Sequence, residues 1–179
     1  MEKIQVWDKT FVPFIKHEEI IAAIDKVAEK INNDFKDSED IPIILCILNG
    51  SLIFTSELMQ RLNFPCELSC IRIASYSGTK STGKSDVLIG LNMDLEGKTV
   101  IIVEDIVDTG KTIGDLTKIL EATGAKDIKI ATLLLKPDVY KGPVKLDYVA
   151  MEIPNRFILG FGLDYDQLGR NYKDIYVLE

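Results

Sequence analysis

Cysteine and histidine are scarce in this sequence of 179 residues. It has three cysteines, Cys46, Cys66 and Cys70, and one histidine, His17. An odd number of cysteines, two of them inside apolar runs, favours packed thiols in a reducing compartment over a disulfide framework. The histidine lies far along the chain from the cysteines, so the sequence has no typical cysteine-histidine zinc motif. We therefore expect neither disulfides nor a structural zinc ion.

Basic residues and long apolar runs are also lacking. Lysine and arginine total 21 against 28 aspartates and glutamates, which gives a net charge of -7. An acidic chain repels nucleic acid, whose non-specific binding depends on lysine and arginine. No segment reaches about 18 consecutive apolar residues, and the N-terminus lacks the apolar core of a signal peptide. We expect a cytoplasmic protein with no nucleic-acid or membrane partner, in which any phosphate ligand needs a local binding device.

The sequence alternates strand-like and helix-like segments. Apolar residues recur at helical spacing over 17–35, and a second helix is expected over 111–122, ended by Gly124. Ser51 is a candidate N-cap for a helix that reaches about residue 62. Strands are expected at 43–48, 68–74, 87–92, 99–103, 127–136, 148–153 and 175–178.

This alternation predicts a single α/β domain over residues 1–179, built on a mostly parallel central sheet flanked by helices. Residues 75–86, with the sequence SYSGTKSTGKSD, are expected to form a polar surface loop. The C-terminal part of the chain contains short strands and loops only. We expect it to form a small cap over one edge of the sheet.

The most informative segment is 100–112, with the sequence VIIVEDIVDTGKT. An apolar strand is followed by two adjacent carboxylates, Glu104 and Asp105, and by Asp108 three residues later. A helix then opens with Thr109, Gly110, Lys111 and Thr112. Ligands of open α/β sheets bind at the carboxyl ends of the strands, and free amides at a helix N-terminus favour a phosphate. The segment predicts a phosphate cradle beside a pair of carboxylates.

A P-loop is excluded by spacing. Gly110-Lys111-Thr112 imitates the end of that motif, which also needs a glycine five residues before Gly110. That position is Asp105, preceded by Glu104, and carboxylates there would repel a triphosphate. A ribose phosphate fits better, because the loop amides can hold its phosphate while the carboxylates accept hydrogen bonds from its hydroxyls.

Segment 100–112 resembles the phosphoribosylpyrophosphate-binding signature of the type I phosphoribosyltransferases. Other segments between residues 45 and 170 resemble the hypoxanthine-guanine phosphoribosyltransferases within that family. The resemblance implies the type I fold, with a cap or hood over the carboxyl ends of the strands. It also implies transfer of a phosphoribosyl group to hypoxanthine or guanine with Mg²⁺ as cofactor. Relatives form dimers or tetramers, so the resemblance implies a homodimer or homotetramer.

The resemblance assigns residues to the ribosyl donor. Asn49 and Gly50 look like the pyrophosphate loop, although the family usually has lysine or arginine at the position of Asn49. Arg170 would also reach the pyrophosphate. Ser75 and Tyr76 would belong to a flexible loop that closes over the site. The ribose and 5′-phosphate would be bound by Glu104, Asp105, Asp108, Thr109, Gly110, Lys111 and Thr112.

The resemblance also assigns residues to the base, the metal and the chemistry. Lys136 would donate to the exocyclic oxygen of the purine, and Phe157 would stack on its ring. The backbone carbonyls of Ile158 and Asp164 would accept its N–H groups. Mg²⁺ would be bound at two places: Glu104 and Asp105 would meet the ribose hydroxyls directly or through Mg²⁺, and Asp164 would coordinate, through water, a second Mg²⁺ on the pyrophosphate. Asp108 would act as the general base.

Two alternatives remain open from the sequence. An enzyme of the same family specific for xanthine would share the signature loop, although Lys136 with Phe157 favours a 6-oxopurine. A regulator with the same fold that binds RNA is the other alternative, and it would need a basic face that a net charge of -7 disfavours.

Overall fold

The computed structural model describes residues 2–73, 87–89 and 93–179. The expected loop at 75–86, with the candidate residues Ser75 and Tyr76, lies outside the described residues. The last three residues of the strand expected at 87–92 lie outside them as well.

The larger of the two sheets has six strands in the order β5-β4-β3-β6-β7-β8. The strands from β4 to β8 in that order run parallel, and the edge strand β5 pairs antiparallel with β4. This confirms the mostly parallel sheet expected from the sequence. Its strands are β3 (Ile43–Leu48), β4 (Glu67–Ile73), β5 (Val87–Ile89), β6 (Thr99–Val107), β7 (Asp127–Leu135) and β8 (Tyr148–Glu152).

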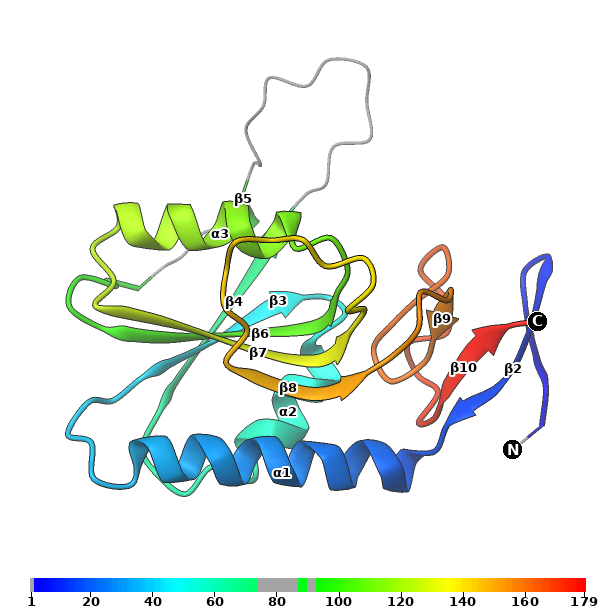
Figure 1. Cartoon of the computed structure of the whole chain (residues 1–179), viewed down its shortest axis with the longest axis horizontal. Helices are drawn as coiled ribbons and strands as arrows, with labels where there is room; N and C mark the ends of the chain where they lie inside the picture. Colours follow the sequence, from blue (N-terminus) through cyan, green and yellow to red (C-terminus); the bar gives the residue numbers. More distant parts are fainter. Residues whose placement is uncertain (1, 74–86, 90–92) are drawn as a thin grey trace, which may run out of the picture.

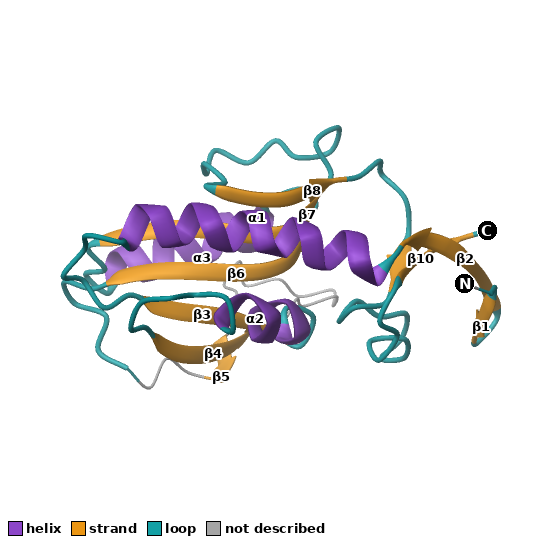
Figure 2. Cartoon of the chain, turned by 90° about the horizontal axis from the view of Figure 1, so that it is seen from below, coloured by secondary structure: helices purple, strands orange, loops and turns teal. Residues whose placement is uncertain are grey.

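Helices cover both faces of this sheet (Figure 1). Helices α1 (His17–Phe35) and α2 (Leu52–Met59) lie on one face, and α3 (Lys111–Ala122) lies on the other. The turned view in Figure 2 places α1 and α2 in front of the strands and α3 behind them. Helix α1 buries Ile20, Ile24, Val27 and Ile31, which recur at the three- and four-residue spacing of an apolar helix face.

The two long helices begin and end where the sequence pattern predicts, but the α2 prediction is wrong in two respects. Ser51 does not cap α2: its hydroxyl donates to the Ile47 carbonyl at 2.7 Å. The backbone of Ser51 is already helical, with φ -77° and ψ -2°, so its side chain points back toward β3 and not toward the amides of the first turn. The helix also ends at Met59, three residues before the predicted residue 62.

Strand β6 is longer than predicted. The expected end at residue 103 is wrong, because the ladder with β7 continues through the pairs Glu104–Thr132 and Val107–Leu135. Glu104 and Asp105 therefore lie within the strand, and only Asp108 follows it. The polar side chains do not end the strand because they lie at the end of the sheet, where they are only partly buried.

A second sheet with the order β1-β2-β10-β9 forms the hood beside the carboxyl ends of the parallel strands (Figure 1). Its strands, all antiparallel, are β1 (Ile4–Val6), β2 (Lys9–Ile15), β9 (Ile158–Leu159) and β10 (Ile175–Leu178). The cap expected from the C-terminal part of the chain is therefore present, but half of it comes from the N-terminus. The Asp174 carboxylate of the hood accepts from the His17 amide at 2.8 Å and so ties the hood to the start of α1.

Candidate active site

The ends of β6 and β7 bring a carboxylate and an ammonium together. Val107 and Leu135 are register partners at the ends of their strands, so the residues that follow them, Asp108 and Lys136, are neighbours. The Lys136 Nζ lies 3.1 Å from Asp108 Oδ2. The lysine side chain is 11% exposed and the aspartate side chain 46% exposed, so the pair stands at the mouth of the site with its carboxylate accessible.

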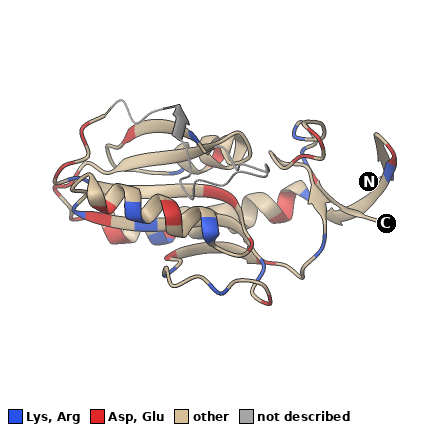
Figure 3. Ribbon diagram, turned by 90° about the horizontal axis from the view of Figure 1, so that it is seen from above, with Lys and Arg blue, Asp and Glu red and all other residues tan. Residues whose placement is uncertain are grey.

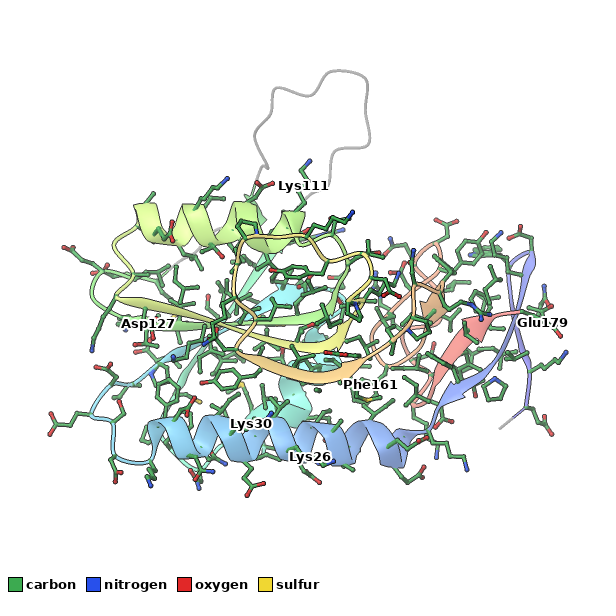
Figure 4. All side chains as sticks on the ribbon, viewed as in Figure 1. Lys26, Lys30, Lys111, Asp127, Phe161 and Glu179 are labelled. Carbon is green, nitrogen blue, oxygen red and sulfur yellow. The ribbon has the colours of Figure 1, made fainter. Side chains whose placement is uncertain are left out.

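The loop after Asp108 has the geometry of an anion cradle. Gly110 has φ 82°, a left-handed conformation that favours glycine, and α3 begins at the next residue. A side chain at Gly110 would also clash with the Tyr140 ring, since a Cβ there would lie 2.4 Å from a ring carbon. Figure 4 shows Lys111 at the start of α3 with its side chain pointing away from the sheet. The amides at this helix start face an incoming ligand.

Two partly buried carboxylates lie in β6 just before this loop. The pKa of Glu104 is raised well above 4.5, mainly because the carboxyl is buried and also because the Asp105 carboxylate lies nearby. The Glu104 Oε2 atom has no hydrogen-bond partner within the described structure. Burial also raises the pKa of Asp105 from 3.8 to about 6. A carboxylate oxygen that is buried without a partner is the kind of group that a divalent cation or a ribose hydroxyl satisfies.

The turn before α2 packs directly on Asp105. The Leu48–Asn49 peptide bond is cis. A Cβ at Gly50 would lie 1.8 Å from Asp105 Oδ2, so only glycine leaves space for that carboxylate. Gly162 of the hood approaches the same turn, because a Cβ on it would lie 2.1 Å from the Gly50 carbonyl oxygen. The candidate pyrophosphate loop therefore touches β6 on one side and the hood on the other.

The hood contributes a second ion pair. Arg170 lies 2.7 Å from Asp164 Oδ1 and donates to the Gly162 carbonyl at 2.8 Å. The other Asp164 oxygen accepts from the Gln167 amide at 2.8 Å. Both residues influence Asp105: the Arg170 guanidinium lowers its pKa, and the Asp164 carboxylate raises it. The three charged groups thus come from distant parts of the chain and converge beside the Gly50 turn.

The candidate base-binding residues differ in exposure. Phe157 is 45% exposed, as a stacking surface requires, whereas Ile158 is 6% exposed and pairs with β10. Figure 4 shows Phe161, which the sequence analysis did not single out, where the hood meets the start of α1. Its ring contacts the His17 ring, with 5.9 Å between the centroids.

The predicted charged residues form two groups, whereas Phe157 packs within the hood against Phe11 and Tyr165. Asp108 and Lys136 lie in contact, and Asp105, Asp164 and Arg170 are close enough to act on one another. The sequence analysis missed Gly162, whose role is visible only from its approach to Gly50 in space. Over the described residues, no three histidine, cysteine, aspartate or glutamate side chains are clustered closely enough to hold a metal ion by themselves. A metal here needs further oxygen ligands from a substrate, as Mg²⁺ commonly does.

A cavity of about 940 Å³ lies between α3 and residues 142–147, and it reaches the phosphate loop at Thr109, Gly110 and Lys111. Basic and acidic residues alternate along α3 (Figure 3). No described helix is both long and apolar enough to span a membrane.

The burial of Asp105 predicts a pH-dependent stability. A carboxyl whose pKa rises from 3.8 in the unfolded chain to about 6 in the folded protein destabilises the fold progressively between pH 4 and pH 6, and fully above pH 6. Asp105→Asn removes that charge. At pH 7.5, without ligand, we expect the free energy of unfolding to rise by about 1–2 kcal/mol, and at pH 4 to change little. Thermal unfolding at both pH values measures this, and a variant destabilised at pH 7.5 contradicts it.

The family of this chain follows from comparison with known proteins. Residues 14–166 match the model of the phosphoribosyl transferase domain. The hypoxanthine-guanine phosphoribosyltransferase of Streptococcus pyogenes is 38% identical over 162 residues, covering 90% of this chain and 89% of the relative. The enzyme of that name from Mycobacterium tuberculosis is 34% identical over 168 residues, covering 90% of this chain and 83% of the relative.

Solved structures agree with this assignment. A hypoxanthine phosphoribosyltransferase from Staphylococcus aureus superposes with a TM-score of 0.87 at 31% identity, covering 94% of this chain and 91% of that one. A hypoxanthine phosphoribosyl transferase from Trypanosoma cruzi gives a TM-score of 0.88 at 32% identity, covering 98% and 95%. The fold is that of the type I phosphoribosyltransferases. The chain belongs to the phosphoribosyl transferase family.

Proposed function

We propose that this protein is a purine-salvage transferase that joins hypoxanthine or guanine to 5-phosphoribosyl-1-pyrophosphate, giving IMP or GMP and pyrophosphate. The observation that carries the proposal is the 3.1 Å pair of Asp108 and Lys136 beside the start of α3. A 6-oxopurine has a ring nitrogen that can give up a proton next to an oxygen that accepts a hydrogen bond. The carboxylate and the ammonium match these two neighbouring groups. The names of the relatives support the same reaction.

The ribosyl donor is proposed to bind across the phosphate loop. The amides from Asp108 to Thr112 and the hydroxyls of Thr109 and Thr112 bind the 5′-phosphate, Gly110 allows its close approach, and Lys111 contributes its amide. Glu104 and Asp105 accept hydrogen bonds from the ribose hydroxyls, directly or through the metal. The backbone at Asn49 and Gly50 binds the pyrophosphate, and the Arg170 guanidinium binds it as well.

The purine is proposed to lie between the core and the hood. Lys136 donates to the oxygen on C6, Phe157 stacks on the ring, and the carbonyls of Ile158 and Asp164 accept the remaining N–H groups. The Lys136 ammonium has three donors and uses one of them for Asp108, so it can donate to the base oxygen as well.

Asp108 is proposed as the general base. A nitrogen of the purine attacks the anomeric carbon of the ribose, the bond to pyrophosphate breaks, and the proton on the other imidazole nitrogen passes to the Asp108 carboxylate. Glu104 and Asp105 hold the sugar, and their negative field favours the positive charge that develops on it. Mg²⁺ would be held by Glu104 and Asp105 at the ribose, with a second Mg²⁺ held through water by Asp164 on the pyrophosphate, and it would supply charge neutralisation of the leaving pyrophosphate.

The proposed function is tested by measuring pyrophosphate release with the ribosyl donor and hypoxanthine, guanine or xanthine in turn. We expect release with hypoxanthine and guanine. Release with xanthine alone would favour the xanthine-specific alternative, and no release with any base would contradict the proposal. The same preparation can be examined for the homodimer or homotetramer that we propose by light scattering.

Removal of the metal is expected to remove the activity. The proposed site brings a polyanionic substrate to Glu104, Asp105 and Asp164, and only a cation can offset that repulsion. EDTA should therefore stop pyrophosphate release, and Mg²⁺ in excess over EDTA should restore it. Binding of the ribosyl donor, followed by calorimetry, should weaken in parallel. Unchanged turnover in chelated, metal-free buffer would contradict the metal assignment.

A further inference from the structure

The Phe157 ring is supported by two other aromatic rings of the hood. Its centroid lies 5.7 Å from that of Tyr165, with the ring planes at 89°, and 6.1 Å from that of Phe11, at 40°. Phe11 and Tyr165 are themselves 6.2 Å apart. These separations and angles are those of favourable aromatic pairs. The three rings contact one another while almost half of Phe157 stays exposed, so its support does not cover the surface left for a ligand.

Tyr165 is held in place from the opposite end of the chain. Its hydroxyl donates to Asp8 Oδ1 at 2.7 Å, and Lys9 Nζ lies 5.0 Å from its ring centroid. Asp8 and Lys9 come at the turn between β1 and β2 and at the start of β2. Phe11, on β2 itself, is fully buried. The N-terminal hairpin thus fixes Tyr165 by a hydrogen bond, a cation-π contact and a buried aromatic neighbour.

We propose that Tyr165 is a positioning residue for the purine, which acts by holding the Phe157 ring in the orientation that stacks on the base. The inference rests on the proposed function, since Phe157 is the stacking residue there. A phenylalanine with an exposed ring can sample several rotamers, and fixing one before the base arrives removes an ordering cost from binding. The N-terminal hairpin thereby takes part in recognition of the base although it does not contact it.

Tyr165→Ala is expected to raise KM for hypoxanthine about 3–10-fold, the worth of one aromatic pair. KM for the ribosyl donor should stay within about twofold, because the phosphate loop and the Gly50 turn are unchanged. Tyr165→Phe keeps the ring and loses only the bond to Asp8, so it should recover most of the wild-type KM. This pattern separates ring support from the hydrogen bond.

Tyr172→Ala is the matched control. Tyr172 lies in the same hood, and its ring centroid lies 5.6 Å from that of Tyr176, whereas the described ring pairs of Phe157 are with Phe11 and Tyr165. The substitution Tyr172→Ala removes the same kind of side chain from the same small core of the hood. If Tyr172→Ala raises KM for hypoxanthine as much as Tyr165→Ala does, the effect is general loosening of the hood and the proposal is overturned. An unchanged KM in Tyr165→Ala overturns it as well.

A readout without turnover keeps this inference separate from the proposed function. The aromatic NMR signals of Phe157, assigned by their loss in Phe157→Leu, should have dispersed shifts in the wild type. They should collapse toward unfolded-chain values in Tyr165→Ala and stay dispersed in Tyr172→Ala. Equal shifts in the wild type and Tyr165→Ala would overturn the inference. A wild type that uses no 6-oxopurine would contradict the proposed function, and the NMR comparison would still decide the positioning role.

Discussion

Asp108→Asn is expected to lower turnover by about 10²–10⁴-fold, the usual contribution of a general base. Asparagine keeps the shape of the side chain and cannot accept the proton. Binding of the ribosyl donor should change much less, because the amides of the loop and the left-handed Gly110 do not depend on this carboxylate. KM for the purine should not rise, since Lys136 loses its 3.1 Å ion pair and is free to meet the base.

Steady-state rates with saturating hypoxanthine and calorimetric binding of the ribosyl donor measure the two effects separately. Asp138→Asn is a suitable control, because it makes the same charge change at an exposed position two residues after Lys136. Turnover near the wild-type rate in Asp108→Asn would remove Asp108 from the proposed chemistry. If Asp108→Asn loses binding of the ribosyl donor and not turnover, Asp108 belongs to the phosphate cradle alone.

The parts of the fold that the sequence predicted are those with a local pattern. Helices α1 and α3 were predicted at their observed positions because their apolar residues recur every three or four positions. Strand β6 was predicted too short because hydropathy falls at Glu104, whereas the strand continues through its pairing with β7. At the end of a sheet, backbone hydrogen bonds between strands form whether the side chains are polar or apolar.

The N-terminal half of the hood was missed because its partner lies at the other end of the chain. Strand β2 pairs with β10, so Val12 lies opposite Val177. Pro13 inside the strand also argues against a strand in a sequence pattern, although an edge or irregular position tolerates it. The register of β10 shifts between Ile175 and Tyr176, close to the pairing with Pro13. A pairing over such a distance has no local signal.

The candidate site divides in the same way. The contiguous loop from Glu104 to Thr112 has a spacing that indicates its chemistry, so the sequence alone located it. The pairing of Asp108 with Lys136 depends on the register of two strands, and the contact of Gly162 with the Gly50 turn depends on how the hood packs. These relationships arise from tertiary structure. The sequence could name Lys136 only through resemblance.

Adenine is expected to be rejected while hypoxanthine and guanine are both used. A lysine ammonium has three donors and no acceptor, so it pairs with the oxygen on C6 of an oxopurine. Adenine has an amino group at that position, and donor would meet donor. Lys136 is nine-tenths buried, so an adenine that separated it from Asp108 would leave the ammonium without an acceptor. A site built to hydrogen-bond its substrate rejects such an analogue by about 10⁴–10⁵ in kcat/KM.

Removal of the Lys136 ammonium should weaken the discrimination against adenine. Lys136→Ala is expected to raise KM for hypoxanthine and guanine and to shrink the margin over adenine, because the variant no longer has a group that adenine leaves unpaired. The neighbouring Lys141, on the exposed loop that follows β7, provides a control substitution of the same type, Lys141→Ala, which should leave all three values unchanged. Parallel kcat/KM measurements on the three bases decide the matter. If adenine turns over as well as hypoxanthine in the wild type, the assignment of a 6-oxopurine substrate is overturned. If Lys136→Ala keeps the full preference for hypoxanthine over adenine, the discrimination belongs to the backbone carbonyls of the hood.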